Sequence, residues 1–332
     1  MTAPMFERVA LIGLGLIGSS LSRAMRHKGL VGSIVGHAQS AKTRDTALRL
    51  GLVSSVYASA AEAARDADLI VLCVPVGACG SLARNMAPVM KAGAILTDVG
   101  SVKGAVVRDV GPSVPRGVHF IPGHPIAGTE HSGPEAGFAE LFEGRWCVLT
   151  PPPGADEAAV GKLAAFWQAC GSHVEVMDAQ HHDLVLAITS HVPHLIAYNI
   201  VNTARHLEQV TDTEVIKFSA GGFRDFTRIA ASDPVMWRDV FLNNKEAVLE
   251  MLGRFSEDLT ALQRAIRFGD GHRLTLDLKR RGAPGFSEGV ELRIINLLHW
   301  GLLLEIVENR RRNKKGKEGD GDGSESDSAC SN

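Results

Sequence analysis

A turn with three glycines near the N-terminus constrains the fold of this 332-residue chain more than any other feature. An apolar run at residues 9–12 is followed by Gly13-x-Gly15-x-x-Gly18 and then by small and apolar residues typical of a helix. Gly13 permits a tight turn, Gly15 lets a pyrophosphate approach the backbone, and Gly18 lets the helix lie close to the strand. The helix N-terminus adds free N–H groups and a partial positive charge. Together these features predict a dinucleotide-binding unit, with a glycine turn of no binding role as the alternative.

The composition excludes several other classes of protein. An apolar fraction of 45% with a charged fraction of 22% is typical of a soluble globular chain, here long enough for two domains. The formal net charge of −2 gives no general attraction to nucleic acid or to an anionic membrane. No run approaches about 20 uninterrupted apolar residues, so no transmembrane helix is expected. The five cysteines lack the paired spacing of a zinc or redox motif, which favours reduced thiols and a cytoplasmic location.

Strand and helix patterns alternate along the first half of the chain, which predicts a parallel sheet covered by helices. The run that follows Asp68, at residues 69–74, is continuously apolar, as in a strand buried on both faces. Polar residues follow several strands directly, where ligands bind to a parallel sheet. Further strands are expected at residues 33–36, 94–97, 118–121, 146–149 and 173–177, and helices at residues 19–28, 43–50, 60–65 and 156–170.

After about residue 177 the strand signals end and helices are expected instead. Residues 245–267 place apolar side chains on one face, and residues 290–307 are apolar almost all round, as in a helix buried in a core or between subunits. From residue 310 the chain is first basic and then rich in glycine, serine and acid, so it has nothing to bury. These patterns predict an α/β fold with a Rossmann-like domain at residues 1–178, a helical domain at 179–308 and a disordered tail at 309–332.

His124 is the main candidate for catalysis. It lies between a glycine and a proline just after the predicted strand at residues 118–121, beside the expected nicotinamide position. An ordinary histidine pKa of about 6.5 suits a general base, whereas the alternative is a histidine that caps the next element. Ser101, in the loop after the neighbouring strand, either orients His124, contacts the cofactor or caps a helix before Lys103.

Two further groups of polar residues lie in the helical half. His191 and His194 share a helix face, but no carboxylate or cysteine completes a metal-ligand pattern, so no metal site is predicted. Polar contacts to a substrate, or capping, are favoured for these histidines. Two glycines at residues 221–222 are expected to break the helix before Arg224, Asp225 and Arg228. An arginine there suits a substrate carboxylate, with a surface loop holding an Arg–Asp pair as the alternative.

Taken together, these motifs resemble the prephenate/arogenate dehydrogenase family of tyrosine biosynthesis. The resemblance rests on the glycine turn, DVGSVKG at residues 98–104, GHPIAGTEHSG at 123–133, SHVPH at 190–194 and GGFRDFTRIAASDPVMWRD at 221–239. It extends over roughly residues 6–305 and is strongest to stand-alone bacterial cyclohexadienyl dehydrogenases. Neither a fused chorismate mutase nor an attached regulatory domain is expected.

The resemblance implies oxidative decarboxylation of prephenate or arogenate to 4-hydroxyphenylpyruvate or tyrosine, with hydride transfer to NAD(P). His124 would accept the proton of the ring hydroxyl, and Ser101 would hold His124 and lie against the nicotinamide. Arg228 would bind a substrate carboxylate, and His194 would line the same site. Glu130 and Asp225 would form a gating interaction.

The resemblance also implies a homodimer formed through the helical domain, with Trp237 contributed across the interface. An acidic residue commonly ends the second strand of an NAD-binding unit, but His37 stands at this position. NAD is therefore the expected cofactor, with NADP left open. The residues expected to contact it are Gly13, Gly15, Leu16, Ile17, Gly18, His37, Val74, Pro75 and Ser101.

Two other functions are weighed against this one. A β-hydroxyacid dehydrogenase would place a catalytic lysine in the helical domain, where only Lys217 and Lys245 are candidates. A non-catalytic dinucleotide sensor would give no reason for His124, Ser101 and Arg228 to occur together. The dehydrogenase acting on prephenate or arogenate is therefore favoured, with a small-molecule substrate and without nucleic acid, membrane or metal as a partner.

Overall fold

The computed structural model describes residues 3–129, 131–211, 217–218 and 220–281. Contacts within the chain define one compact unit that ends at Arg254 and a second that begins at Phe255. The helix expected at residues 290–307 and the tail expected at 309–332 lie outside the described residues.

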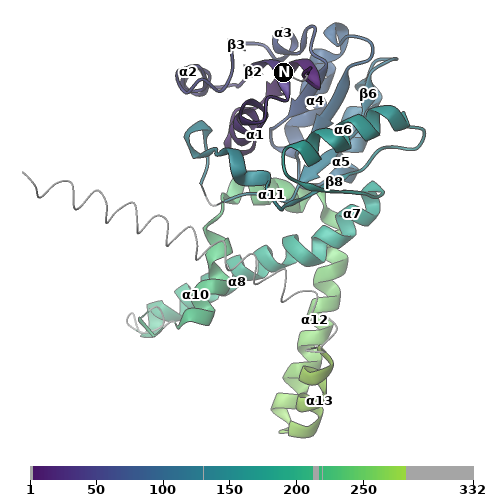
Figure 1. Ribbon diagram of the computed structural model, residues 1–332. Helices are drawn as coiled ribbons and strands as arrows, with labels where there is room; N and C mark the ends of the chain where they lie inside the picture. Colours follow the sequence, from purple (N-terminus) through teal and green to yellow (C-terminus); the bar gives the residue numbers. More distant parts are fainter. Residues whose placement is uncertain (1–2, 130, 212–216, 219, 282–332) are drawn as a thin grey trace, which may run out of the picture. The chain divides into compact units, whose positions relative to one another are not determined.

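Six parallel strands form the main sheet in the order β3-β2-β1-β4-β5-β6 (Figure 1), which is the order of a Rossmann fold. Ile12 is paired with both His37 and Leu72, so the carboxyl ends of β1, β2 and β4 meet at one edge of the sheet. The strands are β1 Phe6–Ile12, β2 Val31–His37, β3 Ser55–Tyr57, β4 Leu69–Leu72, β5 Ile95–Asp98 and β6 His119–Phe120.

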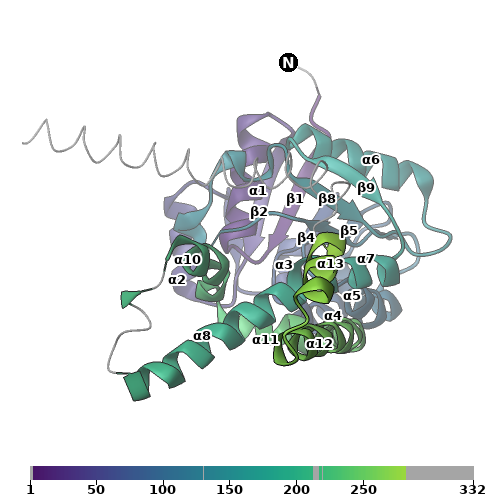
Figure 2. The ribbon, with the colours of Figure 1, turned by 90° about the horizontal axis from the view of Figure 1, so that it is seen from below.

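Helices cover both faces of this sheet (Figure 2). Successive side chains of β1 point to opposite faces of the sheet, and both sets are apolar. Val9 and Leu11 pack into a core with α1, α2 and α6, whereas Ala10 and Ile12 pack into a second core with α3, α4 and α5. A strand buried on both faces needs such a continuous apolar run. The helices are α1 Leu16–His27, α2 Ala41–Arg49, α3 Ala60–Ala64, α4 Val76–Met86, α5 Lys103–Val110 and α6 Glu157–Ala169.

A second, three-stranded sheet contains a strand that the sequence does not predict. In it β7 (Gly123–Pro125) is antiparallel to β8 (Trp146–Leu149), which is parallel to β9 (His173–Val176). His124 was expected in a loop, but it is paired with Val148 inside β7. Short 3-10 helices occupy Ala87–Val89, Gly111–Ser113, Pro134–Ala136, Ala139–Phe142 and Arg228–Ala231.

The rest of the described chain is helical, as expected. A π-helical turn at Ala187–His191 joins α7 (Ala179–Leu186) to α8 (Val192–Thr211), just before Pro193. Proline has no N–H to donate to the preceding turn, which accounts for the local change in pitch. The expected helix break lies at Ala220, just before the two glycines, but Gly221 and Gly222 then begin a new helix and not a loop. The remaining helices are α10 Gly221–Thr227, α11 Pro234–Asn243, α12 Lys245–Arg267 and α13 Gly271–Arg281.

One helical stretch of the described chain, residues 179–207, is long and apolar enough to cross a membrane by length and composition, with a mean hydropathy of 1.5 over its most apolar window of 18 residues. A core helix of a soluble protein meets the same criterion. The start of this stretch is anchored to the first unit, because Asp183 accepts hydrogen bonds from two backbone N–H groups of α5. The expectation that the chain has no membrane partner remains a prediction.

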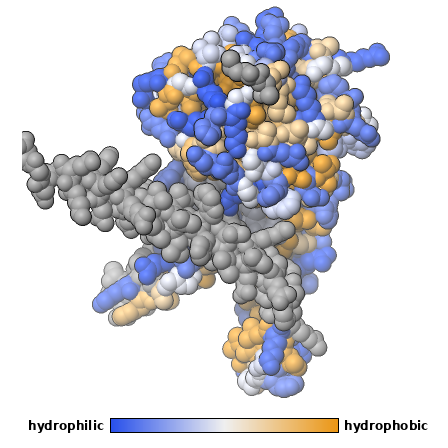
Figure 3. Space-filling model, in the orientation of Figure 1, coloured by the Kyte–Doolittle hydropathy of each residue, from blue (hydrophilic) through white to orange (hydrophobic). Residues whose placement is uncertain are grey.

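The second compact unit contains the end of α12 and all of α13. It presents apolar side chains to solvent (Figure 3), several of them well over a third exposed. These side chains belong to Leu259, Ile266, Phe268, Leu276 and Leu278.

Candidate active site at the carboxyl edge of the sheet

The glycine turn lies at the carboxyl edge of β1, and two of its glycines are required by close packing. Gly13 has a φ of +109°, and a Cβ there would lie 2.1 Å from the carbonyl oxygen of Cys73. A Cβ at Gly18 would lie 2.2 Å from the carbonyl oxygen of Gly13. A Cβ at Gly15, by contrast, would meet nothing within 4 Å. The turn therefore leaves open space over Gly15, where the backbone can be approached by a ligand.

The residues around this space fit a dinucleotide. Gly15 is the N-cap of α1, no side chain caps the helix, and its first turn, which includes Leu16 and Ile17, contains no acid. Its terminal N–H groups are thus available to an anion. Val74 and Pro75 follow β4 at the same edge, and Val74 lies beside Gly13.

His37 ends β2 next to the turn, because the N–H of Gly13 donates to its carbonyl oxygen at 2.8 Å. Its ring Nδ1 lies 3.1 Å from the carbonyl oxygen of Tyr57, which only accepts, so this nitrogen carries the proton. Arg44 is engaged as well, since its guanidinium donates to the carbonyl oxygens of Ala38 and Gln39. The end of β2 therefore presents the Nε2 of His37 at the position where NAD-binding units commonly have a carboxylate for the ribose.

A buried ion pair holds the strand that contains His124. The side chain of Lys103 is completely buried, forms an ion pair with Asp98 and donates to the carbonyl oxygen of Gly123 at 2.6 Å. Asp98 in turn accepts from the backbone N–H groups of Gly100 at 2.8 Å and Gly123 at 3.2 Å. Both backbone polar groups of Gly123 are thus fixed, and with them the position of the next residue, His124.

The His124 ring is buried and hydrogen-bonded to a second histidine. Its Nδ1 lies 2.9 Å from Nε2 of His182, and Nδ1 of His182 lies 2.8 Å from Oδ1 of Asp183. Burial is the main cause that holds the pKa of His124 well below its ordinary value, and the positive charge of Lys103 and the rings of His182 and His191 add to it. His124 is therefore a neutral imidazole at physiological pH.

Ser101 does not hold His124 in this structure. Within the described residues no hydrogen bond joins the two, and the observed partner of the His124 ring is His182. Ser101 does not cap α5 either, since the N-cap is Val102. The sequence alone assigns no role to His182 or to Asp183. A His–Asp pair early in a helix is the only signal that the sequence offers for them.

A second group of side chains gathers around Trp237 on α11. The ring of His194 is stacked on Trp237 with centroids 3.7 Å apart, and its Nδ1 donates to the carbonyl oxygen of Ser190 at 2.8 Å. Burial lowers the pKa of His194, and the positive charge of Arg228 lowers it further. The exposed side chain of Arg228 therefore lies near His194, as the sequence predicts.

Trp237 is buried within its own chain, with 6% of its surface exposed. Its Nε1 and the Nε2 of His191 are both buried without a hydrogen-bond partner among the described residues. Asn244 donates to Nδ1 of His191 at 3.0 Å and to the carbonyl oxygen of Asp183 at 2.8 Å. Since Nδ1 of His191 accepts, its Nε2 carries the proton, and both unpartnered atoms are donors. Buried donors of this kind mark a position for an oxygen atom of a ligand or of water.

The expected gating interaction between Glu130 and Asp225 stays a prediction. Asp225 is exposed on α10, and Glu130, its expected gating partner, lies outside the described residues. The structure brings His124 together with His182, and His194 together with Trp237. His191 lies close to the second pair, with its ring centroid 6.0 Å from that of Trp237.

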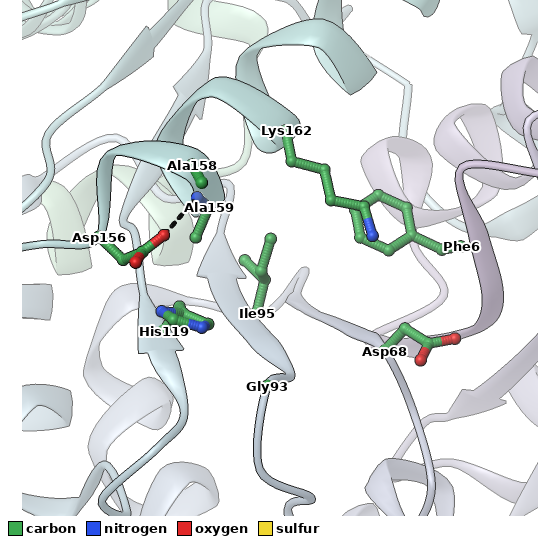
Figure 4. Close-up of a pocket in the computed structure, with 9 residues that line it drawn as sticks. All are labelled: Phe6, Asp68, Gly93, Ile95, His119, Asp156, Ala158, Ala159 and Lys162. Atoms are coloured by element: carbon green, nitrogen blue, oxygen red, sulfur yellow. Dashed lines mark hydrogen bonds between the residues drawn. The ribbon is translucent and has the colours of Figure 1, made fainter.

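A hollow of about 250 Å³ at the opposite, amino-terminal edge of the sheet contains none of these residues (Figure 4). Three of its polar side chains are engaged in the fold. Asp156 accepts from the backbone N–H of Ala159 at 2.7 Å, Lys162 lies over the ring of Phe6, and Asp68 is paired with Lys91. This hollow has no unengaged cluster of charged groups, so the carboxyl edge remains the candidate site.

The fold and the site define a dinucleotide-binding protein whose second part is helical. Residues 21–176 match the nucleotide-binding domain of prephenate dehydrogenase, and residues 178–280 match its dimerization domain. The chain belongs to the prephenate dehydrogenase family, so the resemblance found in its motifs is confirmed.

Individual relatives agree with this assignment. The chain is 42% identical to the cyclohexadienyl dehydrogenase of Zymomonas mobilis over 80% of its own length and 90% of that protein. Among solved structures, the prephenate dehydrogenase of A. aeolicus, in complex with hydroxyphenyl propionate and NAD+, has a TM-score of 0.78 and 33% identity, covering 85% of this chain and 97% of that one. The arogenate dehydrogenase of Synechocystis has a TM-score of 0.71 and 25% identity, covering 86% and 99%.

Proposed function

We propose that the chain is an NAD+-dependent dehydrogenase that oxidises and decarboxylates prephenate, arogenate or both, giving 4-hydroxyphenylpyruvate or tyrosine. The observation that carries this proposal is the buried, neutral His124 at the carboxyl edge of the sheet, on the side where the glycine turn leaves open space. The names of the relatives support the substrate class.

The nucleotide would be held by the glycine turn and the edge residues around it. Gly13, Gly15 and Gly18 with Leu16 and Ile17 would face the pyrophosphate, and His37 the ribose. Val74, Pro75 and Ser101 would lie toward the nicotinamide. When bound, NAD+ supplies the acceptor for the hydride. The A. aeolicus relative contains NAD+, which supports this choice over NADP.

His124 would act as the general base. It takes the proton of the ring hydroxyl while the hydride leaves the same carbon, so the alcohol becomes a ketone. The ring carboxylate then leaves as CO2, its electron pair makes the ring aromatic, and the proton returns to the phenolate oxygen. A positioned base of this kind typically contributes about 10²–10⁴-fold to the rate.

The helical part would bind the rest of the substrate. Arg228 would bind a carboxylate through its planar guanidinium, and His194 would line the same site. The buried donors of His191 and Trp237 support a ligand oxygen near them. Glu130 and Asp225 would form the gating interaction, although both roles rest on the family resemblance alone.

We also propose a cytoplasmic homodimer formed by the helical part, with the domain boundary near residue 178. The match of residues 178–280 to a dimerization domain and the exposed apolar side chains of α12 and α13 support it. Trp237 would contribute across that interface in addition to its contacts within the chain. Light scattering on the purified protein tests the dimer, and a monomer at micromolar concentration would contradict it.

A table of initial rates tests the proposed function directly. Purified protein is assayed for reduced nicotinamide with prephenate and arogenate, each with NAD+ and NADP+. We expect turnover with NAD+ and at least one of the two substrates. Absence of turnover in all four combinations, from protein that binds the nucleotide, would refute the dehydrogenase.

A further inference from the structure

Two residues with no assigned role, His182 and Asp183, form a continuous hydrogen-bonded chain with His124. The chain runs from Nδ1 of His124 to Nε2 of His182 over 2.9 Å, and from Nδ1 of His182 to Oδ1 of Asp183 over 2.8 Å. His182 is completely buried, and Asp183 is 8% exposed. The three side chains come from β7 and α7, which are separated by more than fifty residues of sequence.

Asp183 is itself held firmly at the start of α5. Its Oδ1 accepts from the backbone N–H of Lys103 at 2.7 Å, and its Oδ2 accepts from that of Gly104 at 2.8 Å. The partial positive charge of a helix N-terminus stabilises a carboxylate at this position. Asn244 fixes the backbone of the same residue by donating to its carbonyl oxygen.

These contacts determine where the protons of both histidines lie. The Asp183 carboxylate only accepts, so Nδ1 of His182 must carry a proton. Nε2 of neutral His182 is then an acceptor, so Nδ1 of His124 must donate to it. The remaining nitrogen of His124, Nε2, keeps its lone pair.

The reverse arrangement would require a second proton on His182. His182 would then be an imidazolium that donates to both neighbours, and His124 would carry its proton on Nε2. Burial lowers the pKa of His182 despite the opposing effect of Asp183, and the ammonium of Lys103 lowers it further. The neutral form with the proton on Nδ1 is therefore favoured.

We propose that His182 and Asp183 are positioning residues that fix His124 in the Nδ1–H tautomer and orient the lone pair of its Nε2 for the proton of the substrate. When Nε2 accepts that proton, the positive charge on His124 is shared through His182 and stabilised by Asp183. The tautomer is a property of the chain alone, whereas the catalytic consequence rests on the proposed function.

The tautomer is tested first, on the full chain without substrate. Protein labelled with 15N in its histidines is examined by NMR at neutral pH, and the His124 signals are assigned by their loss in His124→Asn. We expect a protonated Nδ1 and an unprotonated Nε2 at His124. A protonated Nε2 in the wild-type protein would overturn the inference, whatever the enzyme assay shows.

Kinetics then separate positioning from folding. His182→Gln keeps an amide oxygen toward His124 and an amide N–H toward Asp183, whereas His182→Leu removes both. We expect kcat to fall about 10²- to 10⁴-fold in His182→Leu, by analogy with other bases whose tautomer is lost, and less than about 10-fold in His182→Gln. The neighbouring His181 is exposed and its side chain lies outside this chain of hydrogen bonds, so His181→Leu serves as the matched control with unchanged kcat.

The outcomes distinguish this inference from the proposed function. Affinity for NAD+, measured by calorimetry, should be the same in all four proteins. A wild-type enzyme without turnover refutes the function and leaves the NMR result to decide the tautomer. Turnover in wild type together with full kcat in His182→Leu overturns the positioning role.

Discussion

His124 combines burial with a lone pair on Nε2, so its replacement should affect chemistry and spare nucleotide binding. We expect His124→Asn to reduce kcat by about 10²–10⁴-fold, the contribution of a positioned base. The nucleotide turn is built from other residues, so the Kd for NAD+ should stay within about twofold. Steady-state kinetics measures kcat, and calorimetry measures the Kd for NAD+. A variant with wild-type kcat would show that His124 is not the general base.

Arg228 is exposed and lies near His194, which suits a residue that meets the substrate from solvent. Loss of a charged hydrogen-bonded contact costs about 1.5–3 kcal/mol, so Arg228→Ala should raise KM for the substrate about 10- to 100-fold. Arg228→Lys keeps the charge without the planar fork and should give an intermediate KM. If both variants keep the wild-type KM, the arginine does not bind the substrate carboxylate.

At this scale the sequence identifies side chains better than their partners. The residue type and the strand-end position single out His124 as a candidate, and the family resemblance singles out Arg228. The partner of His124 was expected to be Ser101, but it is His182, 58 positions away. That contact depends on how α7 packs against α5, which a local pattern cannot show.

At the scale of elements, two glycines of the turn between β1 and α1 have different roles. Gly13 is required by the fold, whereas Gly15 lies where the nucleotide is proposed to bind. In Gly13→Ala a positive φ and a contact of 2.1 Å to Cys73 must both be relieved. Strain of this kind costs about 1–3 kcal/mol before the clash is counted, so the free energy of unfolding should fall by at least that much. Gly15→Ala meets no neighbour and should change the unfolding free energy by no more than about 0.5 kcal/mol.

The two variants should behave oppositely toward the nucleotide. Gly15→Ala fills the space over the backbone and should weaken NAD+ binding while the apo protein stays stable. Urea unfolding and calorimetry on both proteins check this. Equal destabilisation by the two alanines, or NAD+ affinity unaffected by Gly15→Ala, would contradict the assignment.

Long elements with a repeated apolar pattern could be predicted from the sequence, whereas short elements could not. The sequence predicts α12 at the bounds that the structure has, because its apolar face repeats over six turns. β7 has three residues, and only its pairing with β8 makes it a strand. Gly221 and Gly222 begin α10 instead of ending a helix, because Ala220 starts the turn in an extended conformation.

At the scale of the whole molecule, the sheet and the helices that follow it are joined by polar contacts. Asp183 binds the start of α5, and Asp239 on α11 accepts from the backbone N–H of Gly77 at the start of α4. Residues of both parts therefore share one compact unit that ends at Arg254. The candidate site lies at these contacts, so its geometry depends on the folding of both parts together.

Burial of neutral histidines at the same contacts should make the protein sensitive to mild acid. Burial lowers the pKa of His124, His182, His191 and His194, that of His191 to about 4. Below a pH of about 6.5 the unfolded chain therefore binds more protons at these positions than the folded chain does. The free energy of unfolding should therefore be highest above this pH and fall as the pH decreases toward 4.

Each histidine that stays neutral contributes a slope of about 1.4 kcal/mol per pH unit within this window. The carboxylates with lowered pKa, Asp68 and Asp109, lose their contribution only below about pH 4, so the two effects are separable. His191→Asn removes one titrating ring but keeps an acceptor for Asn244, so its slope between pH 6.5 and 4 should be shallower by up to that amount. Urea unfolding at a series of pH values measures both proteins. A wild-type stability independent of pH in this window would mean that the folded chain binds protons at these histidines as readily as the unfolded chain does, which would contradict their burial as neutral rings.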